Sequence, residues 1–134
     1  MVPQTPPAKM GEVIAIAWNG STETALTVAL GMPFLKEARH VAIVAVGPQH
    51  MPEPGPEGDE LARTLERHGI DVSLHTAYGR QKPQGESFLK EALAAGADML
   101  FKGAYTQSRI RQMIFGGATR HIIMEANLPV LMAR

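Results

Sequence analysis

The sequence contains no cysteine, so neither a disulfide framework nor a thiolate metal site is available. A reducing compartment is therefore the simpler expectation. No apolar run approaches the roughly 20 residues that a membrane helix requires. The first ten residues also lack the continuous apolar core of a signal peptide. We therefore expect a soluble, cytoplasmic protein with no membrane partner.

The sequence also lacks a net charge, because 13 basic residues balance 13 acidic ones. Nucleic-acid-binding proteins normally carry a broad basic surface, so no nucleic-acid partner is expected. The 5 histidines are scattered, without the i, i+4 spacing of a metal-binding helix. No metal site is assigned. A Gly-Lys-[Ser/Thr] phosphate loop is missing too, which argues against a standard P-loop ATPase.

The chain has 134 residues, of which 45% are hydrophobic, enough for one domain with its own core. Apolar strand-like runs alternate with helical stretches, which predicts an α/β fold with a parallel sheet and helices on both faces. Pro33, inside the first helical stretch, predicts a kink or short break before Phe34. The expected strands are 11–17, 41–46, 71–76, 97–101 and 129–132, and the expected helices are 21–36, 57–68, 87–95 and 118–126. Gly69 is expected to end the second of these helices in a left-handed conformation, with Ile70 folding back on Leu65.

Glycines and basic residues gather in the last third of the chain. Gly103 directly follows a strand-like run, and Gly116 and Gly117 precede the last expected helix. Glycine permits tight turns and close backbone approach, and the free amides of a helix N-terminus attract phosphate. Between Asp98 and Glu125 there is no acidic residue, whereas the basic residues there are Lys102, Arg109, Arg111 and Arg120. This segment is therefore expected to bind one polyphosphate.

The same positions resemble the nucleotide-binding signature G-x2-G-x9-G-[S/T] of the universal stress protein family. Gly103, Thr106, Gly116 and Gly117 occupy its four defined positions, although Thr106 replaces a glycine and Gly117 replaces a serine or threonine. The run 13–21, ending in Asn19-Gly20-Ser21, is similar to the first strand of the family and its Asp-Gly-Ser turn, with asparagine in place of aspartate. The resemblance covers about residue 11 to the C-terminus.

The resemblance implies a five-stranded sheet ordered 3-2-1-4-5, in a domain over residues 11–134 with a flexible tail over 1–10. It also implies a regulatory protein of the stress response that binds ATP, possibly with Mg²⁺, in a crevice at the strand ends. The site residues expected there are Asn19, Gly20, Ser21, Val46, Gly103, Thr106, Arg109, Gly116, Gly117, Ala118 and Thr119. The basic segment offers no carboxylate as a base, so ATP hydrolysis should be slow at most, and no catalytic residue is assigned.

Plainer interpretations stay open at several of these positions. The glycines could serve only turns and close packing, and Asn19 and Ser21 could simply cap the first helix. Trp18 favours a packing role, and Arg109 could be ordinary surface charge. The hydroxyl-rich turn 19–24 also resembles a flavodoxin phosphate loop. In function, the main alternative is a dimeric signalling or interaction module of the same family that binds no nucleotide.

The expected last strand, Pro129 to Met132, is short, apolar and placed at a sheet edge. An open edge is a template for pairing with another strand, so it predicts a homodimer joined through this strand. The proline-rich start and the turn at Asn19 also resemble the second halves of tandem two-domain stress proteins. The chain could accordingly form half of a tandem pseudo-dimer.

Overall fold

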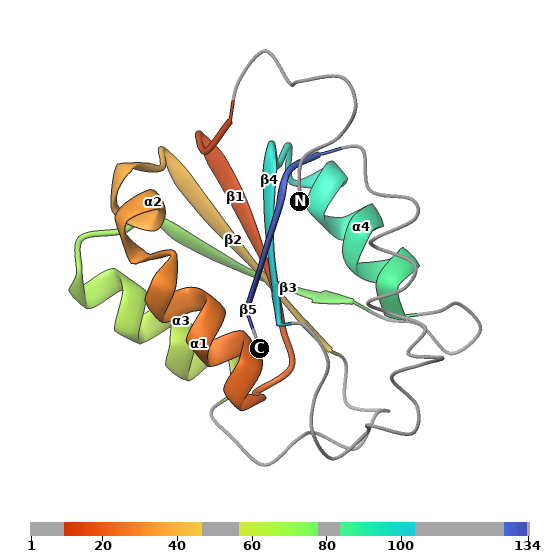
Figure 1. Ribbon diagram of the computed structural model, residues 1–134, viewed down its shortest axis with the longest axis horizontal. Coiled ribbons are helices and arrows are strands. Elements are labelled where there is room, and N and C mark those ends of the chain that lie inside the picture. The colour runs from red at the N-terminus through yellow and green to blue at the C-terminus, as the bar shows by residue number, and fades with distance from the viewer. Residues whose placement is uncertain (1–9, 47–56, 78–83, 104–127, 134) are drawn as a thin grey trace.

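The computed structural model describes residues 10–46, 57–77, 84–103 and 128–133 and shows one five-stranded parallel sheet (Figure 1). The strand order is β3-β2-β1-β4-β5, so the predicted α/β class and the order 3-2-1-4-5 are confirmed. The first strand lies at the centre of the sheet and the last at one edge. The strands are β1 (Val13–Trp18), β2 (His40–Val46), β3 (Val72–Ala77), β4 (Met99–Gly103) and β5 (Val130–Ala133).

Helices cover both faces of the sheet. One face carries three of them and the other face carries α4 (Figure 1). No helix in the described ranges is long and apolar enough to span a membrane. The predicted helix over 118–126 and most of the predicted tail over 1–10 lie outside the described residues. The helices described are α1 (Thr22–Leu30), α2 (Met32–Glu37), α3 (Gly58–Arg67) and α4 (Gln84–Ala94).

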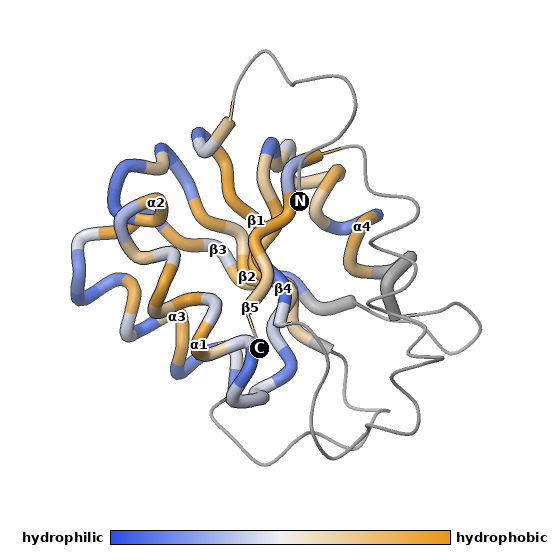
Figure 2. The backbone as a smooth tube through the Cα atoms, viewed as in Figure 1, coloured by the Kyte–Doolittle hydropathy of each residue, from blue (hydrophilic) through white to orange (hydrophobic). Residues whose placement is uncertain are grey.

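The central strand β1 is buried along its whole length and supplies both halves of the core. Successive side chains of a strand point to opposite faces. Ile14 and Ile16 accordingly pack with α1, α2 and α3, whereas Ala15 and Ala17 pack with α4. Trp18 is also buried in the first of these clusters, as its packing interpretation predicted. The most apolar part of the backbone therefore runs through the middle of the sheet (Figure 2).

The predicted break before Phe34 exists and falls at Gly31, between α1 and α2. A Cβ atom at Gly31 would lie 2.2 Å from a ring carbon of Phe101, so only glycine lets the chain pass this buried ring. Pro33 lies in the first turn of α2. Its missing N–H would have had no intrahelical partner there, so proline starts the second helix and does not break the first.

Asp98 explains why β4 begins later than the predicted 97–101. Its carboxylate accepts hydrogen bonds from the backbone N–H groups of Gly11 (2.8 Å), Glu12 (3.1 Å) and Val13 (3.3 Å). The residue thus anchors the entry to β1 and precedes the β4 ladder. At the other end, β4 extends to Gly103, which pairs with Ala133 of β5.

The ends of α3 agree with the sequence-based prediction. Glu57 is the N-cap, Gly69 takes a left-handed φ of 77°, and Ile70 donates its N–H to the Leu65 carbonyl at 3.2 Å. The start of α4 was predicted wrongly at Ser87, since this helix begins at Gln84.

Candidate functional site

The predicted site residues that the structure describes gather at the carboxyl ends of β1 and β4. These strands are neighbours, with Ala17 beside Lys102, so the turn after β1 and the end of β4 lie next to each other. Val46 is the last residue of β2, which pairs with the other side of β1. In open parallel sheets, ligands bind outside the carboxyl ends of the strands, at the point where the strand order reverses. Asn19, Gly20, Ser21, Val46 and Gly103 all lie at this edge.

Asn19 organises the first turn of α1 through its side-chain oxygen. This Oδ1 accepts hydrogen bonds from the Ser21 backbone N–H (3.0 Å) and from the Thr24 hydroxyl (2.8 Å). Ser21 is the N-cap of α1, and its Oγ accepts the Thr24 N–H at 3.2 Å. Gly20 between them has a φ of 78°, a left-handed conformation that suits glycine. The capping interpretation of Asn19 and Ser21 is therefore realised.

This cap limits what Asn19 can offer to a ligand. An amide oxygen has two lone pairs, and Ser21 and Thr24 occupy both. The amide nitrogen still carries two N–H donors that the cap does not use. Asn19 can therefore donate to a ligand but has no acceptor left. An aspartate in the same place would keep the cap with one oxygen and present a second, charged oxygen.

Gly103 is required for close packing. A Cβ atom there would lie 2.6 Å from both the N and the Oγ1 of Thr24, and 2.9 Å from the backbone carbon of Glu23. Gly103 is the last residue of β4 and is not among the positive-φ glycines of the described chain. The close approach expected of this glycine is therefore realised, because the missing side chain makes room for the first turn of α1.

Two threonines that the sequence analysis did not single out hold this corner together. Thr24 and Thr27 are both fully buried. The Thr27 hydroxyl donates to the Glu23 carbonyl (2.8 Å), lies 3.4 Å from the Lys102 carbonyl oxygen, and accepts the Ala133 N–H (3.1 Å). One hydroxyl thus joins α1 to β4 and β5. The sequence signal was the presence of these poor helix formers on the face of α1 that should be buried.

Lys102 departs from its expected role as part of an exposed basic cluster. The residue is only 5% exposed, and its ammonium lies 5.8 Å from the centre of the Phe88 ring of α4. Such a distance permits a cation–π interaction. Strand alternation places this side chain on the α4 face, opposite the contact between Gly103 and Thr24.

The remaining predicted site residues lie outside the described residues; these are Thr106, Arg109, Gly116, Gly117, Ala118 and Thr119. Within the described ranges, no group of three histidine, aspartate or glutamate side chains is arranged to hold a metal ion.

Several solved structures with the same fold are universal stress proteins. One from Archaeoglobus fulgidus matches with a TM-score of 0.71 and 18% identity, over 93% of this chain and 44% of that protein. The chain therefore spans less than half of that relative. A second structure from Archaeoglobus fulgidus, in complex with dAMP, has a TM-score of 0.59 and 15% identity over 96% of this chain and 100% of its own.

A third universal stress protein, in complex with cAMP, matches with a TM-score of 0.65 and 16% identity, over 92% of this chain and 96% of its own. No curated protein sequence matches the chain closely enough to count as a relative. The sequence pattern of the universal stress protein family matches residues 14–134, nearly the whole chain. The chain therefore belongs to the universal stress protein family.

Proposed function

We propose that this protein is a cytoplasmic regulator of the stress response that binds an adenine nucleotide, ATP with Mg²⁺, at the carboxyl ends of β1 and β4. The observation that carries the proposal is the convergence of the Asn19 turn, the N-terminus of α1 and the end of β4 at Gly103. A helix N-terminus beside a strand end with close backbone packing is a favourable place for an anionic ligand.

Two relatives support the choice of an adenine nucleotide, since their structures were solved with dAMP and cAMP. A longer polyphosphate is favoured by the charge of Arg109, Arg111 and Arg120, in a segment that contains no acidic residue. In this proposal the glycine signature holds the phosphates through backbone amides. Asn19 donates from its amide nitrogen to an acceptor atom of the base or the ribose.

The direct test is isothermal titration of the purified protein with ATP, ADP and AMP, with and without Mg²⁺. We expect saturable binding of ATP at submillimolar concentration. A flat titration at millimolar ligand, together with an unchanged melting temperature, would refute nucleotide binding. Visible absorbance of the purified protein would instead support the flavin alternative. Because the basic segment supplies no carboxylate base, we expect ATP turnover to be slow at most.

Two substitutions in the glycine signature are expected to change ATP binding in different directions. Gly116→Val should weaken ATP binding about a hundredfold, because losing two hydrogen bonds to a charged group at ~1.5 kcal/mol each removes ~3 kcal/mol. Thr106→Gly restores the family pattern and should leave binding unchanged or tighten it. Equal affinity of the wild type and a folded Gly116→Val variant would mean that this glycine serves packing only. Weaker binding by Thr106→Gly would show that the threonine hydroxyl contacts the ligand.

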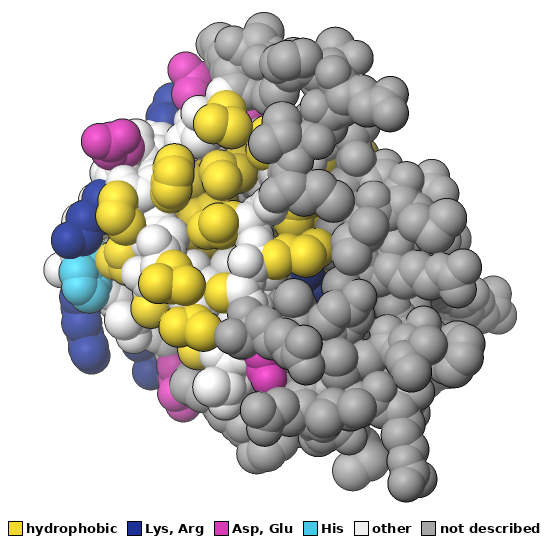
Figure 3. Space-filling view, viewed as in Figure 1, with side chains coloured by type: hydrophobic (Ala, Val, Ile, Leu, Met, Phe, Trp, Pro, Cys, Tyr) yellow, Lys and Arg dark blue, Asp and Glu magenta, His cyan; other side chains and the backbone are white. Residues whose placement is uncertain are grey.

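We also propose that the protein forms a homodimer, or one half of a tandem pseudo-dimer, through the edge strand β5. β5 pairs only with β4 in the described sheet, and α1 packs beside it. Along α1 and α2 runs a row of exposed apolar side chains, Leu26, Leu30 and Phe34. Figure 3 shows hydrophobic side chains gathered on this side of the molecule. A strand at the edge of the described sheet, beside exposed apolar surface, suits pairing with a second copy.

A matched pair of proline variants tests the dimer. The Pro129 carbonyl accepts the Leu100 N–H, so by parallel-ladder alternation Leu131 turns its N–H to β4 and Met132 turns its N–H to the open edge. Met132→Pro should abolish the dimer in light scattering with little loss of stability, because proline is tolerated at edges. Leu131→Pro should lower the stability of the protomer itself, because it removes the N–H that bonds to β4. A monomeric wild type at high concentration, or an intact Met132→Pro dimer, would reject this interface.

A second candidate function is an interaction module that acts through its dimer surface without nucleotide. It is favoured by the full use of the Asn19 oxygen in the α1 cap, which removes an acceptor from the proposed site. Titration with ATP separates the two functions, because only the first requires binding.

A further inference from the structure

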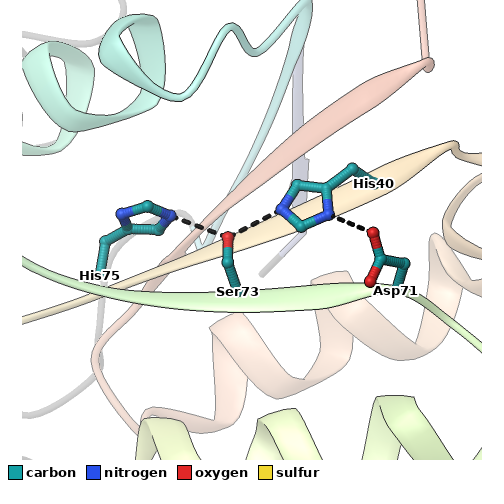
Figure 4. A network of polar contacts seen from close by, with 4 residues as sticks. All are labelled: His40, Asp71, Ser73 and His75. Atoms are coloured by element: carbon teal, nitrogen blue, oxygen red, sulfur yellow. Dashed lines mark hydrogen bonds and ion pairs between the residues drawn. The ribbon is translucent and has the colours of Figure 1, made fainter.

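A second polar site lies away from the proposed nucleotide site, on β2 and β3 (Figure 4). His40 opens β2, Asp71 immediately precedes β3, and Ser73 and His75 lie on β3. Ser73 pairs in register with Ala42, and His75 with Val44, which is packed on the α4 side of the sheet. The four side chains thus follow one face of the sheet along its β3 edge. His40 lies roughly 20 Å from the end of β2, at ~3.3 Å per strand residue.

The contacts form one continuous chain of hydrogen bonds. Asp71 Oδ2 lies 2.8 Å from His40 Nδ1, and His40 Nε2 lies 2.8 Å from Ser73 Oγ. On the other side, Ser73 Oγ lies 2.8 Å from His75 Nε2. Figure 4 shows the serine between the two imidazole rings, with the carboxylate behind the first.

When both histidines are neutral, one set of donors and acceptors satisfies every hydrogen bond in this network. The carboxylate only accepts, so His40 donates from Nδ1 to Asp71 and leaves Nε2 as an acceptor. Only the Ser73 hydroxyl faces that nitrogen in the network, so the serine donates to it. His75 then donates from Nε2 to the remaining lone pairs of the serine oxygen. In this arrangement every proton has an acceptor, with His40 carrying its proton on Nδ1 and His75 on Nε2.

We propose that Ser73 is an activated nucleophile that accepts acyl groups from small activated carboxylic esters. A nucleophile hydrogen-bonded to a base that is itself oriented by a third group is the arrangement that activates serine. Here His40 is the base and Asp71 holds its ring. His75 has a different task, because its N–H already points at the oxygen beside which the carbonyl oxygen of an ester would come to lie.

The reaction balances with water as the only co-reactant. Ser73 Oγ bonds to the carbonyl carbon and its proton passes to His40 Nε2. The charge on the carbonyl oxygen is stabilised by the N–H of His75. The bond from the carbonyl carbon to the leaving oxygen breaks, and the leaving group takes the proton from His40. Water then attacks the acyl-serine with His40 as base, releasing the carboxylic acid and restoring the serine.

The exposure of the site limits its substrates. The Asp71 side chain is 77% exposed and that of His40 is 26% exposed, so solvent screens the pair. Activation should therefore be modest. This favours esters with good leaving groups over amides. Imidazole rings flank Ser73 on both sides (Figure 4), so we take a small acyl group as the substrate to test.

The first test uses p-nitrophenyl acetate and mass spectrometry of the full chain. We expect acetylation at Ser73 and no acetylation of this peptide in Ser73→Ala. His40→Asn should slow acylation about a hundredfold, within the range of general-base catalysis. His75→Asn should slow it less, and His68→Asn on α3 should match the wild type. Acetylation elsewhere only, unchanged rates in His40→Asn, or a larger loss in His75→Asn than in His40→Asn would overturn the proposal.

A second test exploits the cysteine-free chain. Ser73→Cys introduces a single thiol at the site, and Lys36→Cys introduces one on the exposed face of α2 as the matched control. A thiol beside a histidine base is a better nucleophile at neutral pH. We expect iodoacetamide to modify the Ser73→Cys protein at least tenfold faster than the control, and added His40→Asn should remove the difference. Equal rates in the two folded thiol variants would refute activation at this position.

Discussion

At each end of the central strands, one polar side chain accepts several hydrogen bonds, but the two side chains differ in chemistry. At the amino end, the Asp98 carboxylate accepts the N–H groups of Gly11, Glu12 and Val13. At the carboxyl end, the amide oxygen of Asn19 holds the first turn of α1. A carboxylate can only accept, so these bonds hold the entry to β1. An amide also donates. The carboxyl end therefore keeps polar groups that a ligand could use, and the amino end serves the fold.

The largest expected effect comes from a side chain added at Gly103, at the carboxyl end. Gly103→Ala should destabilise the protein by ~3 kcal/mol, the range for overpacking, because the new Cβ meets backbone atoms of α1 that cannot rotate away. Urea unfolding measures the loss. Gly96→Ala is the matched control: Gly96 has a φ of 78° and open space around it, so its cost should be ~1 kcal/mol of backbone strain alone. Equal losses in the two variants would contradict the close approach.

A somewhat smaller effect is expected at the amino end. Asp98→Ala should cost ~2 kcal/mol in urea unfolding, because it removes bonds from three backbone donors to one charged group. Asp59 provides the control, since it is half-exposed and pairs only with Arg63 on the surface of α3. Asp59→Ala should cost less than ~0.5 kcal/mol. If both aspartates cost the same, Asp98 is not the anchor of β1.

The smallest effect on stability is expected from a substitution at the carboxyl end, Asn19→Asp. Asn19→Asp should keep the cap of α1 and leave stability within ~0.5 kcal/mol of the wild type. It removes the N–H donors that Asn19 offers to the ligand and puts a charged oxygen in their place, so ATP binding should weaken about tenfold, equivalent to ~1.4 kcal/mol. Titration calorimetry on both proteins measures the difference. Tighter binding in Asn19→Asp would instead mean that the ligand presents a donor to this position.

Much of the fold could be predicted because it depends on local patterns. Apolar runs marked the strands, and Gly69 with Ile70 marked the end of α3. The break after α1 was predicted from Pro33, but Pro33 only starts the next helix. The cause of the break is the Phe101 ring packed against Gly31, about 70 residues away in the sequence. A single sequence does not show which buried ring a glycine must clear.

In the candidate site, too, features set by a local motif could be predicted, and features set by contacts between distant residues could not. The turn Asn19-Gly20-Ser21 was visible as a motif, and its place after β1 was confirmed. Close packing at Gly103 was among the interpretations of the sequence, but its partner Thr24 was not, because that contact forms only in the folded protein. The network of His40, Asp71, Ser73 and His75 was missed altogether, since scattered histidines gave no spacing signal. Only the register of β2 against β3 brings these side chains together.

The central position of β1 has a consequence for the newly made chain on the ribosome. β1 is synthesised first and can pair early with β2, but its other edge is covered only by β4. The bond from Gly11 to Asp98 joins residues 87 apart in the sequence. Until β4 emerges, a wholly apolar strand presents an open edge. Such edges invite pairing between nascent chains, so the interval between β2 and β4 is when this protein most needs a chaperone.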